Sequence, residues 1–119
     1  MNFTPSDLLI ENEYPKLVRD RIPEIVKAKT GKDIDQRILD DKEFLEYLLK
    51  KLIEEATELQ YAEQKGNTVE ELADIFEIIE ELMKIKGLTM DQVGEVQAEK
   101  REKNGGFLKK ILMLKKVDK

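Results

Sequence analysis

Four acidic residues stand at positions where the sequence pattern would otherwise place core side chains. They form two pairs with a spacing of three, Glu55 with Glu58 and Glu71 with Asp74, and residues three apart project from the same face of a helix. On a helical wheel Glu55 and Glu71 fall within the apolar arcs of their segments, while Glu58 and Asp74 fall at the edges. Four ionised carboxylates at a core edge need a counter-charge, and a divalent cation is the simplest one. The alternative is that ordinary edge acids pair with Lys51 or with cations of a partner chain.

The residue types that are absent decide which cation fits. The 119-residue chain contains no His, Cys or Trp, which excludes Cys/His zinc sites, disulfides, iron–sulfur clusters and Ser-His-Asp or Cys-His catalysis. A ferritin-like di-iron centre is disfavoured as well, because it requires Glu-x-x-His. Carboxylate oxygens without imidazole select hard cations. We therefore expect Mg²⁺, with Mn²⁺ as the second choice.

Two long helices joined by a short turn must position these acids. The first should begin at Asp40 or Asp41, either of which can serve as its N-cap, continue to about Lys65 and stop at Gly66-Asn67. A second helix should follow at once. Because both acidic pairs lie close to the turn, antiparallel packing of the two helices would bring them together.

Two capping-box patterns predict where later helices begin. Thr68 and Glu71 should open the second helix, Val69 to Lys86, and Thr89 with Gln92 should open a third, about Met90 to Lys103. Nearer the N-terminus, Pro23 suits the first turn of a short helix that reaches about Lys29 and ends near Gly31.

The ends of the chain carry weaker signals. All three prolines lie in the first 23 residues, which predicts an irregular segment over residues 1–22. Residues 34–39 and 107–117 could each form a short strand, and the two could pair. The predicted fold is all-α, a single domain over residues 1–119 with a helical core at 40–104, a tail at 105–119 and one or two short strands.

The net charge and the hydropathy pattern limit the kinds of partner that the chain can have. The two long helices have apolar arcs too wide for each other alone, so we expect a second chain to complete a four-helix bundle as an isologous dimer. The net charge of -5 disfavours duplex nucleic acid as a partner. No apolar run is long enough to span a membrane and no signal peptide is recognisable, so the expected location is cytoplasmic.

The acidic motifs and two other segments are similar to those of a known superfamily. Residues 54–58 read E-E-x-x-E and residues 71–74 read E-x-x-D, and the chain also contains KLVRDRIPEI at 16–25 and KREKNGGF at 100–107. Over about residues 14–112 the chain resembles the MazG-like all-α nucleoside triphosphate pyrophosphohydrolases, in particular the subgroup labelled phosphoribosyl-ATP pyrophosphohydrolase-like.

The resemblance implies hydrolysis of a nucleotide between its α and β phosphates, which releases pyrophosphate and a monophosphate. The metal ligands would be Glu55, Glu58, Glu71 and Asp74, and Mg²⁺ held there could neutralise phosphate charge and activate water. Glu54, which points further out on the wheel, would act with Glu55 in catalysis, as an outer-shell ligand or as the base that orients water. As an ordinary residue, Glu54 would be a solvated surface glutamate.

Cationic residues outside the acidic motifs are the candidates for binding the polyphosphate. They are Lys16, Arg19, Arg21, Lys51, Lys100, Arg101 and Lys103. The alternative for each is a solvated side chain or a charge that complements a helix C-terminus. Phe107 could stack on a base or anchor the core.

The sequence leaves two other functions open. One is a non-enzymatic interaction or regulatory module, a helical dimer on the same scaffold. The other is a nucleic-acid binder that uses the basic tail, which the net charge opposes. For the enzyme, the sequence does not choose between nucleoside triphosphates, deoxynucleoside triphosphates and phosphoribosyl-ATP, between housecleaning and biosynthesis, or between one metal ion and two.

Overall fold

The computed structural model describes residues 14–118, and the described residues form four α-helices and no strand. The predicted all-α fold class is therefore confirmed. The chain divides into two compact units, Met1–Lys86 and Gly87–Lys119, which are described separately below. A single domain over residues 1–119 stays a prediction. None of the described helices combines the length and the apolar character needed to cross a membrane.

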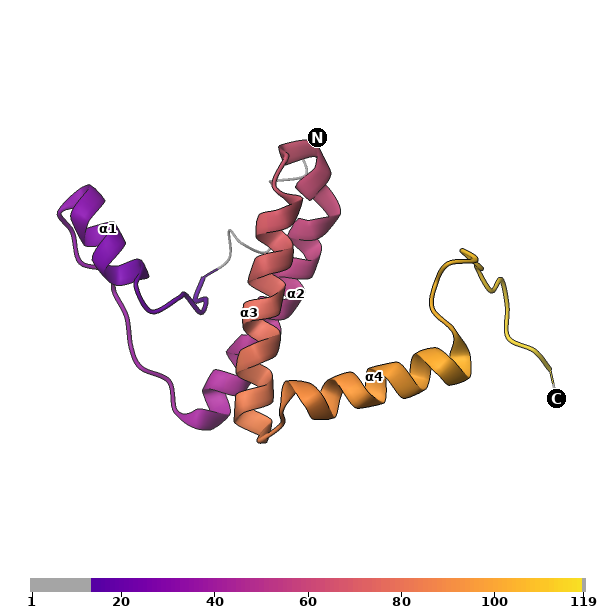
Figure 1. Ribbon diagram of the computed structural model, residues 1–119. Helices are drawn as coiled ribbons and strands as arrows, with labels where there is room; N and C mark the ends of the chain where they lie inside the picture. Colours follow the sequence, from indigo (N-terminus) through magenta and orange to yellow (C-terminus); the bar gives the residue numbers. More distant parts are fainter. Residues whose placement is uncertain (1–13, 119) are drawn as a thin grey trace. The chain divides into compact units, whose positions relative to one another are not determined.

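Helix α1 spans Ile22–Thr30 in the first unit and has the ends that its sequence predicts (Figure 1). Pro23 lies in its first turn, where a missing backbone N–H costs nothing. Gly31 ends the helix in the left-handed conformation, with φ of 74°, and its N–H donates to the carbonyl of Lys27. The residues before α1 that the structure describes are irregular, and the Tyr14–Pro15 peptide bond is cis.

Helix α2 spans Asp41–Lys65 and begins at the predicted cap. The Asp40 carboxylate accepts a hydrogen bond of 2.8 Å from the backbone N–H of Glu43, which satisfies one of the donors that a helix start leaves unpaired. The Glu43 side chain in turn accepts two hydrogen bonds from the Arg37 guanidinium, at 3.1 and 2.7 Å. Gly66 ends α2 with φ of 73°, as its position predicts.

Helix α3 spans Thr68–Lys86 and begins one residue earlier than predicted. Thr68 is its first residue instead of its cap, so only Gly66 and Asn67 separate it from α2. The N–H of Asn67 donates back to the carbonyl of Ala62, which closes the turn tightly. Figure 1 shows the result: α2 and α3 lie side by side and run in opposite directions.

Helix α4 spans Met90–Asn104 in the second unit. Its start confirms the predicted capping box: the Thr89 hydroxyl accepts from the backbone N–H of Gln92, and the Gln92 side chain accepts from the N–H of Thr89. All residues of α4 are exposed, and its apolar residues form no strong stripe.

The two predicted strands are absent from the described part of the chain. Residues 34–39 and 107–117 have no regular secondary structure apart from a turn that begins at Phe107. A strand is stable only when a neighbour pairs with its backbone and an apolar face is covered. Neither segment has such a neighbour among the described residues, so β-forming composition alone was a misleading signal.

The contact between α2 and α3 differs from the predicted one by a rotation of α2. The sequence predicts an apolar stripe centred on Leu45, Leu48, Leu52, Ala56 and Leu59, but only Leu48 of these is buried and Ala56 is exposed. The buried line instead passes through Leu48, Glu55 and Ala62, about 60° around the helix from the predicted centre. All three glutamates Glu54, Glu55 and Glu58 are therefore buried, although the wheel placed only Glu55 of them inside the apolar arc.

The same rotation leaves apolar side chains uncovered. Leu49 and Ile53 of α2 and Leu72 and Phe76 of α3 are exposed, Phe76 by 65%. On two antiparallel helices these positions fall on the side of the pair away from the acids. Ile53 lies at the border of that side, because it also lines a cavity with Tyr47 and Lys50. We call these four residues the open apolar face.

Candidate metal centre and its surroundings

Five carboxylates gather where α2 and α3 meet. Their oxygens form two groups, Glu54 with Glu55 and Glu58, and Glu55 with Glu71 and Asp74. Within each group the oxygens lie within 4.8 Å of one another. The four residues predicted as metal ligands are thus brought together, and Glu55 belongs to both groups.

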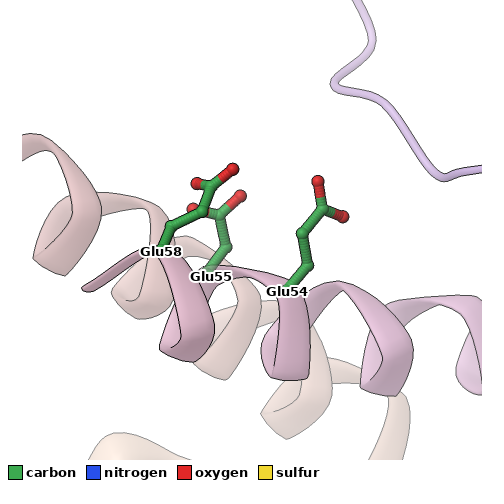
Figure 2. A group of neighbouring side chains, drawn as sticks. All are labelled: Glu54, Glu55 and Glu58. Carbon is green, nitrogen blue, oxygen red and sulfur yellow. The ribbon is translucent and has the colours of Figure 1, made fainter. Parts of the chain in front are cut away.

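Helix α2 supplies three of the five from one side. Figure 2 shows the carboxylates of Glu54, Glu55 and Glu58 projecting in the same direction from α2. Their exposed fractions are only 3%, 5% and 8%. For Glu54 this corrects the sequence analysis, because the alternative of a solvated surface glutamate is wrong.

Helix α3 supplies the other two from its first turns. Glu71 is buried and Asp74 is half-buried. The Glu71 carboxylate accepts a hydrogen bond of 3.2 Å from the side-chain amide of Asn67, which lies in the turn between the helices. The sequence analysis gave Asn67 only a role in ending α2. Its spacing of four from Glu71 was a signal that this amide could reach that carboxylate.

Lys51 is the cation that α2 itself provides. Its Nζ lies 3.3 Å from Glu54 Oε1 and 3.6 Å from Glu55 Oε1, and its side chain is 22% exposed. One ammonium thus serves two buried carboxylates. Pairing with Lys51, the alternative to a metal ion in the sequence analysis, is therefore present for these two acids.

Arg19 is the cation that the N-terminal segment provides. Its Nη2 donates a hydrogen bond of 2.6 Å to Asp74 Oδ1. The pair joins residues 55 positions apart in the sequence. It connects the irregular segment before α1 to the acidic side of α3. The predicted contact of Arg19 with the polyphosphate of a substrate stays a prediction.

The donor set fits a hard divalent cation. Glu55 Oε2 is buried and accepts no hydrogen bond from the described residues. A buried carboxylate oxygen without a donor is costly unless a cation supplies the missing interaction. All the candidate ligand atoms are carboxylate oxygens, which Mg²⁺ and Mn²⁺ prefer over softer ligands.

The remaining predicted binding residues are not all at the carboxylates. Lys16 is half-buried with its Nζ 5.0 Å from the centroid of the Tyr14 ring. Arg21, the residue before α1, pairs with Glu24 in the first turn of that helix at 2.6 Å, and its side chain is 81% exposed. A role of Arg21 in substrate binding stays a prediction.

The other predicted binding residues belong to the second unit. Lys100, Arg101 and Lys103 are exposed on α4, and Lys100 lines a shallow, largely apolar cavity with Leu88 and Val96. Phe107 is 98% exposed, so it anchors no core within the described residues of its own unit. A role of these four residues in substrate binding stays a prediction.

A second feature beside the carboxylates was not predicted. A cavity of about 360 Å³ lies between residues 14–17 and the first half of α2, and Tyr14, Tyr47 and Lys50 line it together with Lys16 and Lys51. Sequence analysis gave no role to the first three, because the cavity joins segments about thirty residues apart. The spacing of three between Tyr47 and Lys50 was the one local signal.

No family model, no curated protein and no solved structure matches this chain. The similarity to the MazG-like enzymes therefore stays a prediction from the motifs at residues 16–25, 54–58, 71–74 and 100–107.

Proposed function

We propose that this protein is a Mg²⁺-dependent nucleotide pyrophosphohydrolase that cleaves between the α and β phosphates. The observation that carries the proposal is the pair of buried carboxylate groups that share Glu55, whose Oε2 has no hydrogen-bond donor among the described residues. Its substrate class is a nucleoside or deoxynucleoside triphosphate, or a phosphoribosyl-ATP-like molecule.

The ligands for the cation would be Glu55, Glu58, Glu71 and Asp74. When bound, a divalent cation supplies charge neutralisation on the phosphates and favours deprotonation of water. The chain has no His or Cys that could supply a base or nucleophile instead. The absence of those residues and the purely oxygen donor set support the same class of chemistry.

The chain's own residues have separate tasks in the reaction. A water oxygen attacks the α-phosphorus, the bond from that phosphorus to the bridging oxygen breaks, and pyrophosphate leaves with the bridging oxygen. The proton of the water passes to a carboxylate, for which we propose Glu54 because it is buried beside Glu55. Lys51 and Arg19 already contact the acids, so they are the cations best placed to meet phosphate oxygens.

The direct test measures pyrophosphate release from a panel of nucleotides with and without Mg²⁺. The variants are Glu55→Gln and Asp74→Asn, and the matched control is Glu63→Gln, which changes an exposed glutamate of the same helix. We expect Mg²⁺-dependent release from the unmodified protein and from the control. Each site variant should lose about 100-fold or more in activity, because an interaction made in the transition state is removed.

The same variants also test the metal site without substrate. Mg²⁺ that binds only the native state raises its stability, by about 2.7 kcal/mol at one hundred times the dissociation constant. The melting temperature should therefore rise with Mg²⁺ in the unmodified protein and in Glu63→Gln, and much less in Glu55→Gln. Full activity in Glu55→Gln and Asp74→Asn would show that these acids are not the site.

We further propose that a second copy of the chain covers the open apolar face, to form the four-helix bundle. An interaction module without enzymatic activity would present the same kind of face. The face therefore also supports the second function, a non-enzymatic helical dimer. The two functions differ in outcome: the module releases no pyrophosphate from any nucleotide, and its melting temperature does not respond to Mg²⁺.

A further inference from the structure

The cavity beside the carboxylates has the character of an anion site. Three lysines line it, Lys16, Lys50 and Lys51, and no Asp or Glu of the described residues does. The chain as a whole has a net charge of -5. Lys51 also pairs with Glu54 and Glu55, and the cluster of three ammonium groups can still draw a negatively charged ligand to this place on the surface.

Two tyrosine rings give the same cavity an aromatic character. Lys16 Nζ lies 5.0 Å from the centroid of the Tyr14 ring, and Lys50 Nζ lies 4.7 Å from the centroid of the Tyr47 ring. Each ammonium is therefore held over a ring face by a cation–π interaction. An anionic group that draws the ammonium toward itself would leave that ring face open for another flat group. The arrangement suits a ligand that has both negative charge and an aromatic ring.

Lys51 connects this cavity to the carboxylates. It lines the cavity, and its Nζ also lies 3.3 Å from Glu54 Oε1. A ligand bound in the cavity with phosphates at Lys51 would therefore have them next to the acidic groups. The volume, about 360 Å³, is at the lower end of the range for small-molecule sites.

We propose that this cavity binds the base and ribose of the nucleotide. Tyr14 and Tyr47 stack on the base, Lys16 and Lys50 contact the phosphates, and Lys51 directs the phosphate chain to the carboxylates. The inference deepens the proposed function and rests on it for the identity of the ligand as a nucleoside polyphosphate. Neither tyrosine, nor Lys50, was among the residues that the sequence motifs indicated.

Nucleotide binding without hydrolysis tests the inference, because it can be measured with Mg²⁺ removed by a chelator. The chain has three tyrosines and no tryptophan, so tyrosine fluorescence reports mainly on this cavity. The probes are ATP, GTP, CTP and UTP, with inorganic tripolyphosphate as the probe that lacks a base. We expect saturable quenching by at least one nucleotide and little change with tripolyphosphate.

Substitutions then locate the binding site. Tyr47→Leu and Lys50→Met should each weaken nucleotide binding about tenfold, measured by isothermal titration calorimetry. Tyr61→Leu is the matched control, because it changes a tyrosine of the same helix that does not line the cavity. It should bind as the unmodified protein does. In the active enzyme, Tyr47→Leu should raise KM more than it lowers kcat, because it removes binding and not chemistry.

The outcomes separate the two proposals. Hydrolysis with Mg²⁺ that keeps its KM in Tyr47→Leu and Lys50→Met would overturn the cavity assignment and leave the proposed function standing. Nucleotide binding that these variants weaken, without pyrophosphate release at any Mg²⁺ concentration, would support the cavity and overturn the enzyme. Equal binding of tripolyphosphate and nucleotides would overturn the role of the tyrosines.

Discussion

Glutamates of α2 occupy positions that aliphatic side chains fill in an ordinary helix pair. Burying an ionised carboxylate removes it from water, and this costs free energy that a nearby cation offsets only in part. Lys51 offers one ammonium to both Glu54 and Glu55, while Glu55 Oε2 accepts no hydrogen bond from the described residues. At the scale of single residues, the site is thus assembled at the expense of stability, as expected where charges have a functional use.

The substitution Lys51→Met should reveal the free-energy cost of burying Glu54 and Glu55. Without divalent cations we expect the free energy of unfolding to fall by about 1–3 kcal/mol, because two buried carboxylates lose a charged partner. Mg²⁺ should then raise the melting temperature more than it does in the unmodified protein, since the ammonium no longer competes for the same oxygens. Thermal unfolding with and without Mg²⁺ measures both effects.

The matched control is Lys84→Met, which removes an exposed lysine paired with Glu81 on α3. Its response to Mg²⁺ should equal that of the unmodified protein. A Lys51→Met protein that is as stable in chelator as the unmodified chain would contradict the assigned role of Lys51.

At the scale of the helices, local signals set nearly all the ends. Asp40, Gly66 and Thr89 act on backbone groups within four residues of themselves, so the sequence alone predicts where α2 and α4 begin and where α2 ends. Thr68 is the exception by one residue. The two absent strands depended on a partner elsewhere in the chain, which no local pattern can supply.

The packing of α2 on α3 was harder to predict than the ends of these helices. A helical wheel orders residues around one helix, but it does not say which part of a wide apolar arc meets the neighbour. The structure buries Glu54, Glu55 and Glu58 and leaves Ile53 and Ala56 exposed. The wheel therefore placed Glu55 correctly inside the buried arc and placed Glu54 and Glu58 wrongly outside it. The cavity lined by Tyr14 and Tyr47 could not be predicted from the sequence, because it depends on where the N-terminal segment packs against α2.

The stability of the protein should depend on pH through an ion pair at the start of α2. The hydrogen bonds that Glu43 accepts from Arg37 hold the pKa of Glu43 below the ordinary value of 4.5. A carboxyl group with a lowered pKa in the folded state stabilises the protein above its ordinary pKa, and this contribution is lost as the pH falls through the lowered value. Arg37→Met should therefore lower the melting temperature at neutral pH, and the difference from the unmodified protein should vanish at acidic pH.

Thermal unfolding from pH 7 to about pH 3 checks this expectation. Lys42→Met is the control, since it removes an exposed positive charge from the same helix start without touching the Arg37–Glu43 pair. A difference for Arg37→Met that stays constant across this range would mean that the ion pair with Glu43 is not its cause.

Gly66 and Gly94 should respond in opposite ways to alanine. Gly66 has φ of 73°, where a side chain with Cβ is strained, so Gly66→Ala should destabilise the protein by about 1 kcal/mol or more. Gly94 lies inside α4 and a Cβ there would meet nothing within 4 Å. Gly94→Ala should therefore raise the stability of α4, by up to about 1 kcal/mol. Circular dichroism during chemical denaturation measures both, and a stabilising Gly66→Ala would show that this turn is not constrained as described.

At the scale of the whole molecule, the open apolar face is exposed to water in a single copy of the chain. Phe76 is 65% exposed beside Leu72, and Leu49 and Ile53 are exposed on the adjoining helix. Exposed apolar side chains gathered on one side of a helix pair often mark an interface, because their contact with water is unfavourable. A second copy of the chain, related by a two-fold axis, could cover this side.

Phe76→Glu should convert the proposed dimer to a monomer. A charge at the centre of a closed apolar interface would have to lose its hydration, so association should weaken by 100-fold or more, on the order of 3 kcal/mol. Light scattering coupled to size exclusion measures the mass. Glu77→Gln, at the next and exposed position, should leave the mass at two chains. A monomeric unmodified protein would contradict the four-helix bundle.

The arrangement of acids and apolar residues on opposite sides of α2 and α3 has a consequence for how two copies would work. If the open apolar faces meet, the two carboxylate centres point away from the seam and share no ligand. Binding of a cation or substrate at one centre would then not directly change the affinity of the other centre. Ligand saturation should follow a simple hyperbola, and an inactive copy paired with an active one should leave half of the activity intact.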